Sequence, residues 1–198
     1  MKFFRLVALA FTILVLAGCA HDFVRPAPEA LKVGHSTKDD VLKVAGNPTL
    51  KNDKVQINGE TIQTLTYFYV KGAKFYGLIA PQRTLTYSFF NDVLIGEEFN
   101  SSFDEETTNF EAEKAFDIVK GKSTKADVIA ALGKPAGDVR YPIIKDKDGR
   151  GVVYEYTVSR HGGLIMITTQ LVLVITLDAN NVVSDVSYKK NGVEQIKS

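Results

Sequence analysis

Few residues of this 198-residue chain have the types and spacing that catalysis or metal binding requires. The histidines are His21, His35 and His161, and the single cysteine is Cys19. They do not form the close His/Cys/carboxylate spacing that zinc needs. No Gly-x-Ser-x-Gly nucleophile elbow is present. Gly162-Gly163 lacks the downstream Gly-Lys-Ser/Thr of a phosphate loop, so we interpret it as turn chemistry between strands.

Carboxylates give one further candidate for chemistry. The run Asp104-Glu105-Glu106 could supply catalytic acids, but the polar stretch around it favours a solvated linker between two units. The formal net charge of +1 gives no strong field for nucleic acid. The sequence therefore predicts no enzyme, no cofactor, no metal site and no nucleic-acid partner.

The N-terminus has the three parts of a secretory signal. Lys2 and Arg5 precede the apolar run from Leu6 to Leu16, and small residues follow. Leu16-Ala17-Gly18-Cys19 resembles the bacterial lipobox, which implies removal of residues 1–18 and acylation of Cys19. An ordinary signal peptide with a chance cysteine is the alternative. Several acyl chains hold a folded domain on a membrane stably.

The residues after Cys19 predict where the domain is held. Residues 19–30 are expected to be a tether, because Pro26 and Pro28 disfavour a helix there. By resemblance to enterobacterial lipoproteins, Ala20 in place of an Asp implies transport to the outer membrane, with the domain on its periplasmic face.

Two stretches are nearly the same: GHSTKDDVLKVAGNP from Gly34, and GKSTKADVIAALGKP from Gly121. Eight of the fifteen positions are identical at a constant offset of 87 residues. In each copy a Thr followed three residues later by an Asp predicts a capped helix start, and a Gly and a Pro predict its end. The paired positions are Thr37 and Thr124, Asp40 and Asp127, Gly46 and Gly133, and Pro48 and Pro135.

Strands repeat with the same offset. Tyr67 and Tyr69 in TLTYFYV correspond to Tyr154 and Tyr156 in VVYEYTV, and alternation puts each pair on one strand face. We expect the tyrosines in the core, with a ligand platform as the alternative. The apolar run from Leu164 to Leu177 favours a core strand over a membrane span.

A second helix is expected in each copy. The stretch TTNFEAEKAFDIVKG, from Thr107, has Phe110, Ala115, Phe116 and Val119 at spacing that suits a helix face, and 27–33 is a weaker analogue. The predicted fold is therefore α+β, with two tandem repeats at 31–104 and 105–198. In each repeat two helices pack on a three- or four-stranded antiparallel β-meander.

These motifs, twice in register behind a lipobox, resemble the SmpA/OmlA or BamE-like outer-membrane lipoprotein domain. Two tandem copies are similar to the architecture of β-lactamase inhibitory protein. The chain departs from the first pattern in its duplication and in having Tyr67 where a Trp is usual. The resemblance implies a non-catalytic periplasmic domain that binds protein or envelope partners.

Three functional hypotheses remain. The first is a lipid-anchored scaffold or accessory factor in outer-membrane assembly or envelope maintenance. The alternative is an inhibitor-like binder that grips an enzyme or a foreign factor on a concave two-sheet surface. An envelope hydrolase is the third, with no residue to nominate. The connections 71–83 and 159–170 are the candidate contact regions, and simple variable turns are the competing interpretation. Their candidate contact residues are Lys74, Phe75, Tyr76, Arg160 and His161.

Overall fold

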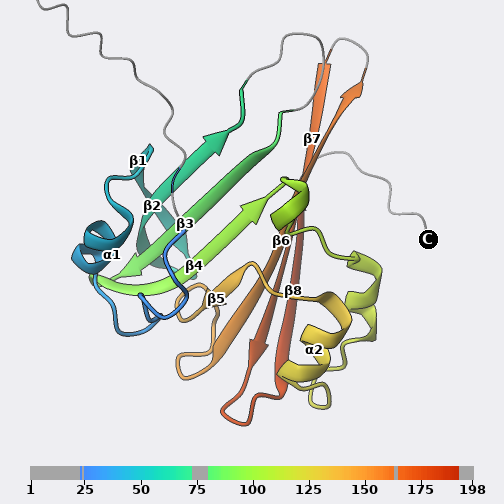
Figure 1. Cartoon of the computed structure of the whole chain (residues 1–198). Helices are drawn as coiled ribbons and strands as arrows, with labels where there is room; N and C mark the ends of the chain where they lie inside the picture. The colour runs from blue at the N-terminus through green and yellow to red at the C-terminus, as the bar shows by residue number, and fades with distance from the viewer. Residues whose placement is uncertain (1–22, 24, 73–79, 163–164, 192–198) are drawn as a thin grey trace, which may run out of the picture.

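The computed structural model describes residues 23, 25–72, 80–162 and 165–191 (Figure 1). Over these residues eight strands form one antiparallel sheet, in which each strand pairs with the next along the chain. The strands are β1 (Leu50–Ile57), β2 (Glu60–Val70), β3 (Gln82–Phe90), β4 (Val93–Ser101), β5 (Gly137–Val139), β6 (Arg150–Gly162), β7 (Ile165–Leu177) and β8 (Val183–Asn191). The helical elements are α1 (Lys38–Ala45), α2 (Lys125–Leu132) and the 3-10 helices η1 (Asp104–Glu106) and η2 (Ala112–Asp117).

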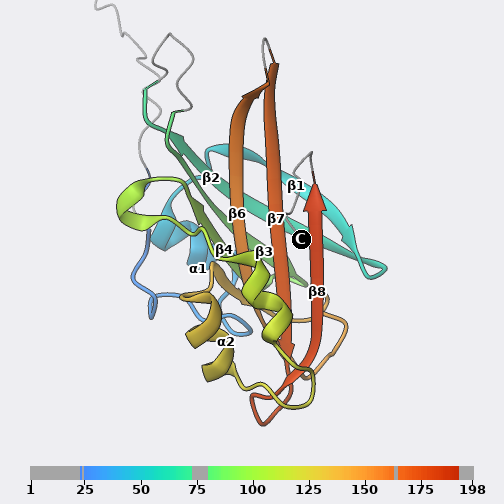
Figure 2. The same ribbon diagram turned by 90° about the vertical axis from the view of Figure 1, so that its right-hand side faces the viewer.

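The predicted fold, in which two helices pack on a β-meander in each repeat, is wrong. The described chain forms one continuous curled sheet, to which each half contributes four strands and one short α-helix. Figure 2 shows both α-helices on the same side of the sheet. The halves join because β4 pairs with β5. Left apart, these two strands would be open edges with unpaired backbone N–H and C=O groups. Neither α-helix of the described chain has the length or hydrophobicity that a membrane span needs.

Both α-helices begin at the capping boxes that the sequence predicts. The Asp40 amide donates to Thr37 Oγ1 at 3.2 Å, and the Thr37 amide donates to Asp40 Oδ2 at 3.0 Å. The equivalent distances between Thr124 and Asp127 are 3.3 and 2.8 Å. These hydrogen bonds, chiefly those from the threonine amides, stabilise the carboxylates and lower the pKa of Asp40 and of Asp127.

A tyrosine of the sheet holds the end of each α-helix. Tyr67 Oη donates to the carbonyl oxygen of Gly46 at 2.6 Å, and Tyr154 Oη donates to that of Gly133 at 2.9 Å. Both glycines have positive φ, 74° and 79°, which favours glycine. Because the last carbonyls of a helix lack intrahelical partners, each hydroxyl satisfies one of them. Both tyrosines are buried, which confirms the core prediction for them.

Each half has its own apolar core between its helix and the sheet. In the first half it consists of Leu31, Val41, Leu65, Tyr67, Leu85, Tyr87, Phe89, Leu94 and Phe99. In the second half it consists of Val128, Leu132, Val152, Tyr154, Leu173, Ile175, Leu177 and Val183. We call this side of the sheet the helix face and the opposite side the free face. The run ending at Leu177 is strand β7, as the sequence predicts.

The second helix expected in each repeat is not an α-helix. Residues 27–33 form turns in the first half. In the second half η2 is a 3-10 helix, and Ala115 and Ile118 pack on the core. Their spacing of three residues suits a 3-10 helix, in which residues i and i+3 lie above one another. Phe116, expected on the buried face, is 78% exposed.

The seam between the halves is β5, which has only three residues. It pairs with residues 96–98 of β4 on one side and with 151–153 of β6 on the other. It does not begin earlier because α2 ends at Leu132, Gly133 caps that helix, and Pro135 has no backbone N–H to donate. Gly137 approaches β4 so closely that a Cβ there would collide with the carbonyl oxygen of Glu97.

After β5 the chain crosses the free face as the loop 140–149. Isoleucines of the loop and valines of the sheet form a small cluster, which consists of Ile143, Ile144, Val139, Val153, Val172 and Val174. Asn58 Nδ2 in the β1–β2 turn donates to the carbonyl oxygen of Pro142 at 2.8 Å, and Tyr141 Oη donates to Glu60 Oε1 at 3.0 Å. Because β3 and β4 lie between these partners in the sheet order, the sheet curls toward the free face.

Removing either hydroxyl that holds a helix end should destabilise the protein. We expect Tyr67→Phe and Tyr154→Phe each to lower the free energy of unfolding by about 1–2 kcal/mol, because a glycine carbonyl loses its donor. Urea denaturation of the purified chain measures this. Tyr69→Phe is the matched control, since the contacts of Tyr69 are through its ring, which stacks on Phe103 at 6.1 Å. Equal effects of the three changes would contradict the assignment.

Candidate functional site

A polar hollow opens on the free face where the halves meet. It has a volume of about 290 Å³, and two strands from each half line it. The lining residues are Gln82, Thr84, Thr86, Glu98, Asn100, Glu155, Thr157 and Gln170. The hollow lies beyond the end of β5, where β4 and β6 continue with no strand between them, so it exists only when both repeats are present.

Side chains bridge the halves across this gap. Asn100 Nδ2 on β4 donates to Glu155 Oε1 on β6 at 3.0 Å and to Thr157 Oγ1 at 3.2 Å. Gln170 Nε2 on β7 donates to the same Glu155 oxygen at 2.6 Å. These amides compensate the Glu155 carboxylate from both sides. The Asn100 amide also joins β4 to β6 where the short β5 supplies no backbone hydrogen bonds.

Glu98 has no such support. Among the described residues no donor reaches its carboxylate, which is half-buried beside Glu155. Burial, and then the charge of Glu155, raise the pKa of Glu98 to about 7. A carboxyl group that is poorly hydrated and close to a like charge is an unfavourable arrangement for folding. Such arrangements are enriched at functional sites.

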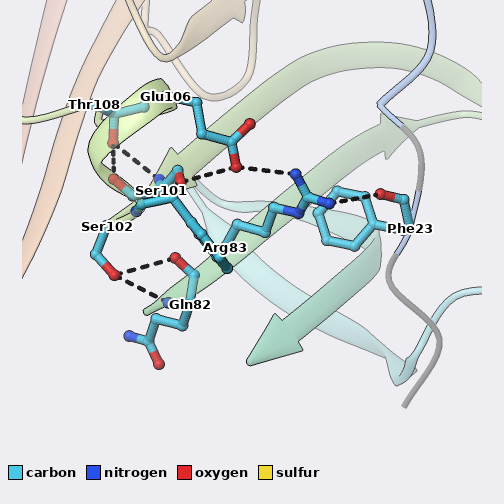
Figure 3. A network of polar contacts seen from close by, with 8 residues as sticks. Phe23, Gln82, Arg83, Ser101, Ser102, Glu106 and Thr108 are labelled. Atoms are coloured by element: carbon cyan, nitrogen blue, oxygen red, sulfur yellow. Dashed lines mark hydrogen bonds and ion pairs between the residues drawn. The ribbon is translucent and has the colours of Figure 1, made fainter. Parts of the chain in front are cut away.

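Glu106, the last residue of the acidic run 104–106, belongs to a structural clamp on the helix face. Arg83 Nη1 on β3 donates to Glu106 Oε1 at 3.0 Å, and Arg83 Nη2 donates to the carbonyl oxygen of Phe23 at 3.4 Å (Figure 3). Ser101 Oγ donates to the same Glu106 oxygen at 3.1 Å. Glu106 therefore orders the linker between the halves instead of lying free in solvent. The catalytic interpretation of this run gains no support.

The contact residues predicted from the sequence do not meet in a described site. Cys19, Lys74, Phe75 and Tyr76 lie outside the described residues. Arg160 and His161 belong to β6, where they pair with Ile167 and Met166 of β7. Most of the stretch 159–170, expected to be a hairpin connection, is therefore strand. Within the described ranges, no group of three or more His, Cys, Asp or Glu side chains could hold a metal ion.

Sequence reasoning missed the residues of the hollow. Alternation on β3 puts Thr84 and Thr86 opposite the buried Leu85 and Tyr87, so their face could be read from the sequence. The sequence did carry one signal for the hollow, because Glu98 and Glu155 are acidic residues within two predicted strands. That Glu98 and Glu155 come together depends on the β4–β5 pairing, which no local pattern indicates.

Comparisons with known proteins give little. No protein-family model matches the chain, and no curated protein matches it. Among solved structures, a "putative beta-lactamase inhibitor protein" from Streptococcus mutans is similar, with 11% identity and a TM-score of 0.39. The match covers 78% of this chain and 82% of that one. A likeness at this TM-score carries no conclusion about function. No model of the BamE-like family that the sequence resembles, and no curated member of it, matches the chain.

The hollow should make stability depend on pH through Glu98. Its folded-state pKa of about 7 lies above the ordinary 4.5, so the folded chain binds this proton more tightly than the unfolded chain. The stabilisation is therefore present below pH 4.5 and is lost as the pH rises through 7. We expect Glu98→Gln to remove this loss, which is on the order of 1–3 kcal/mol between pH 4.5 and 8.

Urea unfolding at a series of pH values tests this. The control is Glu105→Gln, which removes an acid from the exposed linker instead of the hollow. A pH dependence that Glu98→Gln leaves unchanged would show that Glu98 is not the group responsible.

Proposed function

We propose that this chain is a protein-binding module, not an enzyme, and that the hollow of its free face grips a segment of a partner protein. The observation that carries the proposal is the hollow itself, a polar cleft that strands from both repeats build together. The proposal follows the inhibitor-like hypothesis, in which the partner is an enzyme or a foreign factor. It differs in one respect, since the binding surface belongs to a single sheet and not to two.

The chemistry of the hollow favours a cationic side chain from the partner. Glu98 and Glu155 place two carboxylates in one cleft, and the described chain supplies hydrogen-bond donors only to Glu155. A Lys or Arg at the tip of a partner loop would neutralise the pair through charge-assisted hydrogen bonds. The surrounding threonines and amides offer adaptable partners for the loop backbone. A cationic side chain from an inserted loop would thus offset the repulsion between the Glu98 and Glu155 carboxylates in the free protein.

We also propose that the domain is lipid-anchored. The support is the lipobox that ends at Cys19, behind a charged start and an apolar run. On this proposal Cys19 carries acyl chains, residues 19–30 are the tether, and the domain lies at the periplasmic face of the outer membrane. The anchor would restrict the search for the partner to that compartment.

Photo-crosslinking in cells should distinguish the two faces of the sheet. We expect a crosslinking amino acid at Thr86, in the hollow, to give one discrete adduct, and Glu98→Gln in the same chain to reduce its yield at least about fivefold. Immunoblotting measures the adduct, and mass spectrometry identifies it. Val44 on α1, which is 47% exposed, is the control position on the helix face. The same adduct from both positions, or none from Thr86, would contradict the proposal.

The anchor has its own test in an enterobacterial host. Mass spectrometry of the mature N-terminus should show an acylated Cys19. Ala20→Asp should move the chain from the outer-membrane to the inner-membrane fraction, and Ala20→Ser is the control that should leave it in place. An unmodified N-terminus, or wild-type protein in the soluble fraction, would refute the anchor while leaving the binding proposal standing.

A further inference from the structure

A second cleft, which we call the seam groove, lies where the two halves meet and is separate from the hollow. It has a volume of about 610 Å³. Five segments line it: residues 25–35 before α1, Glu97 on β4, α2 with the turn after it, the strand β5 with Arg140, and the start of β6. None of the residues that line the hollow belongs to the seam groove. The inference drawn from it therefore does not rest on the proposed function.

Positive charge is concentrated in this groove. Its lining includes six Lys or Arg side chains and only two acidic ones. Both acids are already paired, Glu97 with Arg25 and Asp138 with Lys125, each at 3.4 Å. Within the described residues the other four cations, Lys32, Lys134, Arg140 and Arg150, have no acidic partner. A net formal charge of +4 in one groove of a chain with a total of +1 is a strong local asymmetry.

Arg140 is built into the groove. Its side chain lies over Gly34, where a Cβ would be 2.8 Å from Nε and 3.1 Å from both Cδ and Cζ. Gly121, the equivalent of Gly34 in the second repeat, has open space in its place. The Arg140 amide donates to the carbonyl oxygen of Ile95 at 2.8 Å, which fixes the backbone that carries the side chain. Arg140 is half-buried and has no carboxylate partner among the described residues, so its guanidinium can pair with an anion from outside.

We propose that the seam groove binds an acidic peptide segment of a protein partner. The unpaired cations come from four different lining segments, so they suit several carboxylates along an extended chain better than one compact anion. Between them the groove has apolar residues, including Leu31, Val33, Ile129 and Pro135, which fit apolar side chains of the same segment. Arg140 forms the fixed contact, and the exposed lysines adapt to the spacing of the acids.

Binding to the purified full-length chain tests this with two fluorescent decapeptides. One alternates Glu and Leu, and the other has Gln at every Glu position. We expect the acidic peptide to bind and the Gln peptide not to bind. The double change Lys134→Gln with Arg140→Gln should weaken binding of the acidic peptide at least about tenfold. Raising the salt from 50 to 200 mM should also weaken binding of the acidic peptide, because carboxylates and cations are screened.

The matched control is Lys54→Gln with Lys122→Gln, which removes the same charge from exposed positions outside the groove. It should leave peptide affinity within about twofold. Urea unfolding confirms that both double variants fold. Equal weakening by both would overturn the proposal, because attraction would then follow total charge. It is also overturned if the acidic peptide does not bind, or if inorganic phosphate binds in a groove-dependent manner and the peptide does not.

Discussion

Strand β5 pairs only residues 137–139 with its neighbours, and both candidate clefts depend on that limit. The pairing is enough to join two repeats into one sheet and to give hydrogen-bond partners to backbone groups at the inner edge of each repeat. It is too short to fill the space between β4 and β6, so side chains such as Asn100 bridge the gap and leave a hollow. The chain that enters and leaves β5 borders the seam groove.

Local chemistry made the repeating parts of the fold predictable. A Thr and an Asp three residues apart can satisfy each other's backbone groups at a helix start wherever the helix lies. The end of each helix is also set by local residues, because a glycine with positive φ and a proline soon after it stop the helix. The strand tyrosines were predicted as core from alternation alone. Their hydrogen bonds to Gly46 and Gly133 were not predicted, because they depend on how the helix docks.

The failures came from pairings that act over a long range. Joining the halves removes two open edges, and that gain is invisible in either repeat taken alone. In the stretch from Thr107, Phe110, Ala115 and Ile118 pack on the core while Phe116 is exposed, and a 3-10 turn places Ala115 and Ile118 there without a longer α-helix. Gly151 did carry a signal, since a glycine inside a strand often marks a close approach. Here the approach is that of Val139 and Ile144, whose side chains would lie 2.7 and 2.9 Å from a Cβ at this position.

Arg140 of the seam groove and Glu155 of the hollow differ between the repeats, whereas the shared caps and tyrosines hold the fold. At the 87-residue offset Arg140 corresponds to Asp53, which lies on the outer strand β1, and Glu155 corresponds to Phe68. The shared caps and tyrosines repeat with nearly the same geometry in both halves. A duplicated unit keeps whatever each copy needs to fold, while positions at the seam meet only in the joined sheet. Those positions can therefore diverge without harming either copy, which is how an acidic hollow and a cationic groove arise in one nearly neutral chain.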